Sequence, residues 1–107
     1  MDRVATLTEI VQREVEDYAR GGDYKAVTRP VSDVARQTYA VVVVPDLPRP
    51  FKARVVVMAR IVDDYVVIDE DTTDRPLVHE LVRAGIPREK IICLYLGEQL
   101  SEKSAEE

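Results

Sequence analysis

The sequence is poor in the residues on which many active sites are built. Its 107 residues include one cysteine, one histidine, four glycines and no tryptophan. The single cysteine, Cys93, cannot form an internal disulfide, so the sequence gives no sign of an oxidising compartment. The glycines are too dispersed for a phosphate-binding loop, and no second cysteine or histidine accompanies Cys93 at zinc-ligand spacing. We therefore expect no cofactor and no resident metal.

Long apolar runs are also missing. No run approaches the roughly 20 residues that a membrane span needs. The first three residues lack the apolar core of a signal peptide. We therefore expect a cytoplasmic protein without a membrane partner.

The sequence has no excess of positive charge. Fifteen lysines and arginines are scattered among twenty acidic residues, and the net charge is −5. Proteins that bind nucleic acid through its phosphates usually carry a basic stripe, because counterion release supplies much of the affinity. Direct nucleic-acid binding is therefore disfavoured and a protein partner is favoured. A weak DNA-binding module stays as an alternative if the basic residues of the middle third share one face. These residues are Arg29, Arg36, Arg49, Lys52, Arg54 and Arg60.

What the sequence does contain is typical of a small globular domain. Apolar residues make up 46% and charged residues 33%, a balance that favours a folded, soluble chain. The length fits a single core. We expect one domain over residues 1–97, followed by a polar tail over 98–107.

Two helices are predicted. Apolar residues recur at spacings of three and four over 3–20, which indicates an amphipathic helix that the glycines at 21–22 end. The second helix starts after Thr73, whose hydroxyl can cap it, and it has Pro76 in its first turn. Gly85 supplies the left-handed position that ends this helix.

Five further segments are rich in β-branched residues and are predicted to be strands. Pro30 has no N–H to donate to a neighbouring strand, so it marks the first as an edge strand. Together with the helices they predict an α+β fold. Its mainly antiparallel, four- to five-stranded sheet has an N-terminal helix and a second helix before the last strand. The predicted strands are 25–31, 37–44, 54–61, 65–68 and 91–96, and the predicted turns and loops are 32–33, 45–50, 62–64 and 69–72.

The central strands indicate that both faces of the sheet are apolar. Residues 41–44, 55–58 and 91–96 do not alternate between apolar and polar, as they would in a sheet with one solvated face. Two short helices cover roughly one face, so we infer that a second copy or another protein covers the rest. The alternative is that the two helices lie on opposite faces. The residues expected at the partner surface are Tyr39, Val41, Val43, Arg54, Val56, Met58 and Tyr95.

The isolated histidine and cysteine are interpreted as structural. His79 lies beside the apolar stripe of the second helix, and no serine or cysteine nucleophile stands at a recognisable spacing from it. Cys93 lies between Ile92 and Leu94 in the last predicted strand, where a small buried hydrophobe is expected. No catalytic residue is therefore predicted.

A group of acidic residues is the strongest argument for catalysis. Carboxylates near strand ends can hold Mg²⁺ for phosphodiester cleavage, which leaves a metal-dependent nuclease using Asp63, Asp69 and Asp71 as an alternative. Each acid also has an ordinary role, in a hairpin turn, a solvated loop or the positive end of a helix. The whole group is Asp63, Asp64, Asp69, Glu70, Asp71 and Asp74.

Three segments carry a family resemblance. The strand–turn–strand run 61–68, the Thr-acid helix start 71–74, and the run 80–91 with its Gly-Ile-Pro-Arg-Glu-Lys-Ile ending resemble the XisI family. Members of this family are fdxN-element excision controlling factors known from cyanobacteria. The similarity spans roughly residues 3–96, and its specific part is 61–91.

The resemblance implies an accessory role in the programmed excision of a DNA element. It also implies a nuclease-fold partner resembling XisH, and no catalytic residue comes with it. A homodimer is compatible with this role. The sequence departs from the family pattern in two places, 45–47 where members carry Gly-Trp and 94–98 where members carry an aromatic, proline-bearing segment. The partner surface is therefore expected to differ if the second segment contributes to it.

Overall fold

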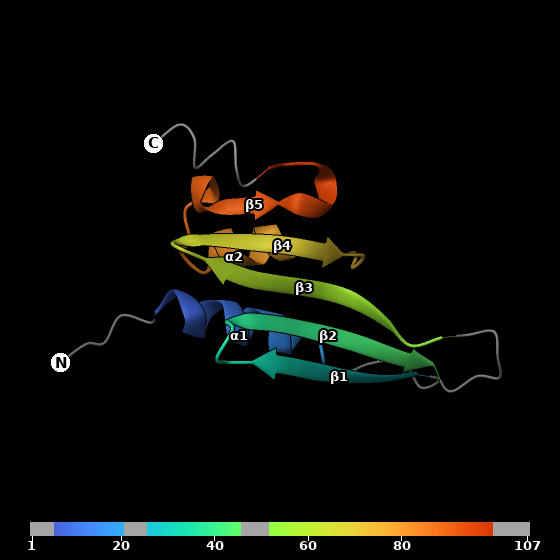
Figure 1. The fold of residues 1–107 in the computed structure, drawn as a ribbon. Coiled ribbons are helices and arrows are strands. Elements are labelled where there is room, and N and C mark those ends of the chain that lie inside the picture. The colour runs from blue at the N-terminus through green and yellow to red at the C-terminus, as the bar shows by residue number, and fades with distance from the viewer. Residues whose placement is uncertain (1–5, 21–25, 46–51, 100–107) are drawn as a thin grey trace.

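The structure is a computed structural model that describes residues 6–20, 26–45 and 52–99 (Figure 1). None of the helices in these ranges is long and apolar enough to cross a membrane. In chain order, the elements are α1 (Leu7–Asp17), β1 (Ala26–Asp33), β2 (Thr38–Pro45), β3 (Arg54–Val62), β4 (Tyr65–Asp71), α2 (Leu77–Arg83), the 3₁₀ turn η1 (Arg88–Lys90), β5 (Ile91–Cys93) and the 3₁₀ turn η2 (Leu94–Leu96).

The five strands form one sheet in the order β1-β2-β3-β4-β5. The first four are antiparallel to their neighbours, and β5 runs parallel to β4. A parallel pair needs a crossover connection, which α2 supplies between β4 and β5. The predicted α+β fold is thereby confirmed, and so is the edge position of β1.

The first helix is shorter than the predicted span 3–20. Its start is fixed by a capping box, in which the Thr6 hydroxyl accepts a bond from the Glu9 N–H and the Glu9 carboxylate accepts one from the Thr6 N–H. Val11 and Val15 form its buried stripe. Residues 3–5 and the glycines at 21–22 lie outside the described residues.

Two of the predicted turns are wrong because the strands continue through them. The turn predicted at 32–33 lies later, since Asp33 still pairs with Thr38 in the β1–β2 hairpin. The loop predicted at 69–72 is a strand as far as Asp71. Here Ala59 pairs with Ile68 and Met58 with Glu70, so the sheet accommodates Asp69 as an extra residue in a β-bulge.

The last predicted strand, 91–96, is wrong beyond Cys93. The chain bends into η2 at Leu94, and Gly97 adopts a left-handed φ of 96° that returns it towards β5. The Glu98 carboxylate then accepts a hydrogen bond from the Cys93 N–H at 2.8 Å. The tail predicted over 98–107 therefore begins with a residue that is bonded to the sheet, and 100–107 lie outside the described residues.

The second helix ends as predicted but begins later. Pro76 is its N-cap residue, and Thr73 does not cap it. At the other end, the N–H groups of Gly85 and Ile86 donate to the carbonyls of Val82 and Leu81, which is the hydrogen-bond pattern of a Schellman motif. Gly85 has a φ of 110°, a conformation that glycine adopts without strain.

Candidate partner-binding surfaces

Both helices cover the same face of the sheet (Figure 1). Val11 and Val15 of α1 belong to one buried cluster with Leu77 and Leu81 of α2, together with side chains from β2 to β5. The alternative in which the helices lie on opposite faces is therefore wrong. One face of the sheet, here called the open face, carries no helix among the described residues.

Side-chain contacts identify which residues of β1 face the helices. The Thr28 hydroxyl donates to the Ala19 carbonyl at 2.8 Å, and the Ser32 hydroxyl donates to the Glu16 carboxylate at 2.9 Å. Successive side chains of a strand point to opposite faces. Val27, Arg29, Val31 and Asp33 therefore lie on the open face.

The same alternation places residues of β2 and β3. Tyr39 and Val41 are fully buried against the helices, so Ala40, Val42 and Val44 point the other way. In β3, Val56 is an extra residue in the pairing with β2, and it packs on the core like its neighbour Val57. Val55 therefore lies beside Val42 on the open face. Met58 lies between the buried residues Val57 and Ala59 and also faces outwards.

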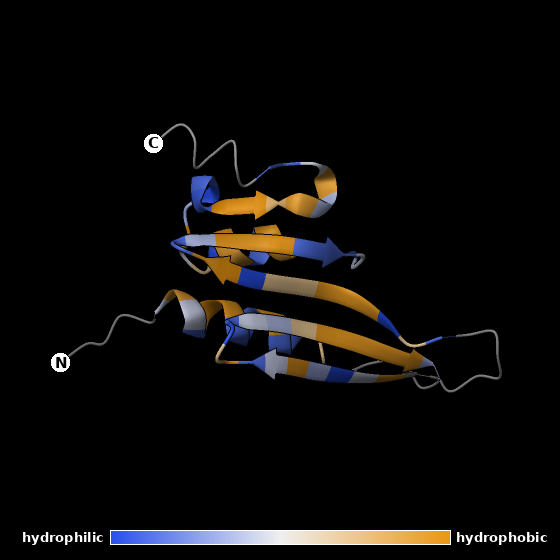
Figure 2. Cartoon of the chain, in the orientation of Figure 1, coloured by the Kyte–Doolittle hydropathy of each residue, from blue (hydrophilic) through white to orange (hydrophobic). Residues whose placement is uncertain are grey.

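The result is an apolar area that we call the valine patch. It spans β1, β2 and β3, where Figure 2 shows long apolar segments along β2 and β3. On β1, Val31 is 51% exposed and Val27 is 45% exposed, and Arg29 lies between them on the same face. The patch consists of Val27, Val31, Ala40, Val42, Val44, Val55 and Met58.

The two edges of the sheet are less available than the open face for contact with another chain. On β1, Pro30 pairs with Val41 in the middle of the strand and has no N–H for another strand to bind. On β5, Arg88 donates to the Ile91 carbonyl at 2.7 Å and Glu98 accepts from the Cys93 N–H at 2.8 Å. Side chains thereby take the place of a further strand at that edge. Sequence spacing does not indicate this arrangement, because Arg88 in η1 and Glu98 after η2 are ten residues apart, with β5 between them.

The residues that the sequence pointed to for the partner surface are divided between the two faces. Tyr39 and Val41 are fully buried under the helices, and Val56 and Tyr95 pack on the same core, so these four contribute to the interior of the chain. Met58 belongs to the valine patch. The other two are Val43, which pairs with Thr28 on the helix side, and Arg54, which is exposed at the start of β3.

The strand register identifies outward-facing valines that the sequence analysis did not name. The pairing of β1 with β2 places Val27 opposite Val44 and Val31 opposite Ala40. Both valines lie within the predicted strand 25–31, but without the register the sequence did not show that they face away from the helices.

The acidic residues are separated by the structure. The Asp69 carboxylate accepts a hydrogen bond from Arg60 at 2.8 Å on the open face. Asp71 points to the helix side, where it accepts bonds from the Thr73 N–H at 2.9 Å and the Leu77 N–H at 2.7 Å. Asp63 lies in the β3–β4 turn with a φ of 56°. In the described ranges no three acidic, histidine or cysteine side chains are grouped so that they could hold a metal ion.

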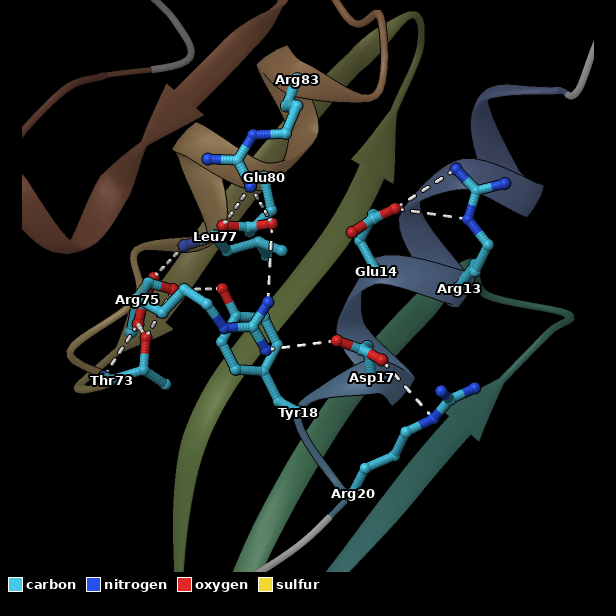
Figure 3. Close-up of polar contacts among 11 residues, drawn as sticks. Arg13, Glu14, Asp17, Tyr18, Arg20, Thr73, Arg75, Leu77, Glu80 and Arg83 are labelled. Carbon is cyan, nitrogen blue, oxygen red and sulfur yellow. Dashed lines mark hydrogen bonds and ion pairs between the residues drawn. The ribbon is translucent and has the colours of Figure 1, made fainter.

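A cluster of polar side chains joins the two helices (Figure 3). The Tyr18 hydroxyl donates to the Arg75 carbonyl, and the Arg75 guanidinium lies 4.2 Å from the centre of the Tyr18 ring. Arg75 also forms ion pairs with Asp17 at 3.3 Å and with Glu80 at 3.5 Å. Burial raises the pKa of Tyr18 well above its ordinary value, so this hydroxyl stays protonated and serves as a donor. The cluster therefore fixes α1 against α2.

The histidine and the cysteine differ in their surroundings. His79 is exposed on α2. Cys93 is fully buried, and this burial raises the pKa of its thiol, because the charged thiolate is disfavoured away from water. A buried, protonated thiol is a poor nucleophile, which agrees with the interpretation of Cys93 as a small core residue.

The basic residues of the middle third do not form a continuous stripe. Arg29 and Arg60 lie on the open face, and Arg60 is paired with Asp69. Arg36 pairs with Asp33 at 3.1 Å in the β1–β2 turn. Lys52 and Arg54 are exposed before and at the start of β3, and Arg49 lies outside the described residues.

Comparison with known proteins gives a consistent family. No curated protein matches the chain. A crystal structure described as a XisI-like protein from Anabaena variabilis is 27% identical, with a TM-score of 0.72 over 80% of this chain and 81% of that one. A second, described as fdxN element excision controlling factor XisI from the same organism, is 20% identical, with a TM-score of 0.67 over 89% of this chain and 92% of that one, and it supports the fold. The family model described as XisI protein matches residues 1–104, so the chain belongs to the XisI family.

Proposed function

We propose that this protein is a non-catalytic accessory factor that takes part in the programmed excision of a DNA element. It acts by binding an XisH-like protein of nuclease fold, and it works in the cytoplasm as a homodimer. Family membership supports the excision role, and one of the similar structures is described as an excision controlling factor.

One observation carries the binding role, namely the number of large apolar side chains exposed on so small a chain. Most of them form two separate groups, four valines on the open face and Leu94 with Leu96 on η2. Clustered apolar exposure of this kind marks protein contact sites in soluble proteins. Two groups suit a factor that contacts both a copy of itself and a different protein.

We assign the η2 group to the XisH-like partner. Leu96 is 67% exposed, the highest value among the large apolar side chains of the described residues. Tyr95 packs on the core between Leu94 and Leu96 and so holds both leucines at the surface. The same segment follows the last strand, where this sequence departs from other family members, which fits a surface adapted to its own partner.

The partner is tested by co-expression. The tagged chain is co-expressed with the XisH-like product of an adjacent gene, and the wild-type chain is expected to retain that product during purification. A Leu94→Ser, Leu96→Ser double variant should lose most of the retained protein. Val82→Ser is the matched control, because Val82 is 43% exposed and belongs to α2, not to η2. Failure of the wild-type chain to retain the partner contradicts this function.

The non-catalytic character is tested separately. The purified chain is incubated with single- and double-stranded DNA and Mg²⁺ or Mn²⁺, and no cleavage is expected, because Asp69 and Asp71 are engaged in structural contacts. Cleavage that an Asp69→Ala, Asp71→Ala double variant abolishes, while circular dichroism shows that the variant is folded, would establish the nuclease alternative instead.

A further inference from the structure

We infer that the valine patch is the dimer interface, and that its occupant is the valine patch of a second copy. The two open faces pack against each other about a two-fold axis that runs parallel to the strands between β2 and β3. This inference rests on the homodimer in the proposed function and is independent of the XisH-like partner.

The closed edges favour a face-to-face arrangement. Extension of the sheet through β1 meets Pro30, which cannot donate to a second strand. Extension through β5 would require removal of the Arg88 and Glu98 side chains from the Ile91 carbonyl and the Cys93 N–H. Packing of one open face on another disturbs none of these contacts.

The strand register makes the face complementary to itself in shape. Val31, Ala40, Met58 and Glu70 form one row across β1 to β4. The two-fold axis places β2 of one copy over β3 of the other, so the small Ala40 lies opposite Met58 of the partner subunit. Sheets that pack face to face are about 10 Å apart, a distance that interdigitating valine and methionine side chains fill.

The charges at the borders of the face are also complementary. Arg29 lies on β1 and Glu70 on β4, at opposite sides of the patch, and neither has an ion-pair partner among the described residues. The same axis places β1 over β4 of the other copy. Along β1, Arg29 lies one outward-facing position away from the row that contains Glu70. This offset along the strand is about 7 Å, and the long arginine side chain spans it to reach Glu70 of the partner subunit. The symmetry forms this contact twice.

The area fits a weak dimer. The valine patch spans three strands about 4.8 Å apart and about 26 Å long, which gives a face of roughly 370 Å² on each copy. On β4 the outward-facing Val67 is already fully buried, so this strand adds mainly Glu70 at the border. Two such faces bury about 750 Å² in total, which is in the range of weak, transient contacts. We therefore expect a dimer whose population depends on concentration.

The test uses the purified chain alone, measured by sedimentation velocity over a wide range of concentrations. The wild-type chain should convert from monomer to dimer. Arg29→Glu and Glu70→Arg should each raise the dissociation constant by about tenfold or more, since like charges then meet twice in every dimer. The double variant with both reversals should restore the wild-type constant. Glu89→Arg, an exposed reversal on η1, is the matched control and should have no effect.

A substitution inside the patch provides a second, independent measurement. Val42→Asp should give a monomer at every concentration, whereas Val82→Asp on α2 should not, and circular dichroism checks that both variants are folded. A wild-type monomer at all concentrations overturns the inference, and so does a dimer that Val42→Asp leaves intact. If single charge reversals weaken the dimer but the double reversal does not restore it, the proposed orientation is wrong. A monomer that still retains the XisH-like protein would refute the interface and the homodimer, while leaving the role of binding that partner in place.

Discussion

Arg88 and Glu98 form an ion pair of 2.8 Å across the free edge of β5, and each also binds a backbone group of that strand. The hydrogen bond with Glu98 is the main reason that the pKa of Arg88 is raised, so the guanidinium stays charged. This pair replaces a neighbouring strand for Ile91 and Cys93. It explains how a strand of three residues can end the sheet without exposing unpaired N–H and carbonyl groups.

Replacement of Glu98 by alanine should destabilise the fold. The Cys93 N–H then has no side-chain acceptor, and loss of a hydrogen bond to a charged group costs about 1.5–3 kcal/mol. The ion pair itself adds little, since the Arg88 side chain is half exposed to solvent. Urea denaturation measures the change in the free energy of unfolding. Glu89→Ala, on the exposed side of η1, is the control, and an equal effect of both variants would contradict the role of Glu98.

Replacement of Pro30 by threonine should make the edge of β1 available to other chains. Threonine suits a strand and supplies the N–H that proline lacks, so the edge gains a donor for an incoming strand. We expect association beyond the dimer, measured by light scattering at increasing concentration. Pro87→Thr, at the start of η1, is a proline control away from the sheet edge. The interpretation fails if Pro30→Thr shows the same mass distribution as the wild-type chain.

Asp71 is expected to be essential for the connection between β4 and α2. Its carboxylate accepts hydrogen bonds from the Thr73 N–H, the Thr73 hydroxyl and the Leu77 N–H at 2.9, 2.6 and 2.7 Å. Asp71→Ala removes all three, and we expect a loss of about 2–4 kcal/mol from the free energy of unfolding. Asp74→Ala is the matched control, because Asp74 is exposed in the same turn. Thermal or urea unfolding of both variants measures their loss of stability. Similar losses for Asp71→Ala and Asp74→Ala would contradict the role assigned to Asp71.

The hydrogen bond between the Asp71 carboxylate and the Leu77 N–H also shows why the start of α2 could not be predicted. Thr73 is a good capping residue by type, and the sequence placed it at the helix start. In the structure, the capping role belongs to Asp71, which reaches the Leu77 N–H from the end of a strand. An acceptor side chain six residues before the N–H group that donates to it is outside the spacing rules for helix caps, and only the path of the chain brings the two together.

The sheet was predictable because its strands differ so clearly in composition from the turns. The edge position of β1 and the end of α2 at Gly85 followed from local patterns, whereas the order of the strands in the sheet was not predicted. The excess of apolar surface on the strands also followed from the absence of alternation. Which residues carry that surface depends on the bulges at Val56 and Asp69, each of which changes the face of the residues that follow. Bulges leave little trace in a sequence, so the outward position of Val55 could not be predicted from Met58 by simple alternation. In β2, whose residues are apolar on both faces, the sequence could not show which set of alternate residues the helices cover.

Alkaline pH should destabilise the protein through Cys93. Because burial raises the pKa of this thiol, the folded chain keeps its proton while the thiol of the unfolded chain ionises above about pH 8.5. The contribution of the protonated thiol to stability is therefore fully present at neutral pH. The free energy of unfolding then falls as pH rises, by up to about 1.4 kcal/mol for each pH unit. Urea denaturation at several pH values between neutral and the onset of tyrosine ionisation measures this slope. Cys93→Ala should be less stable at neutral pH because it leaves a small cavity, but its stability should change less over the same window. Parallel pH profiles for the two proteins would show that the thiol is not the group responsible.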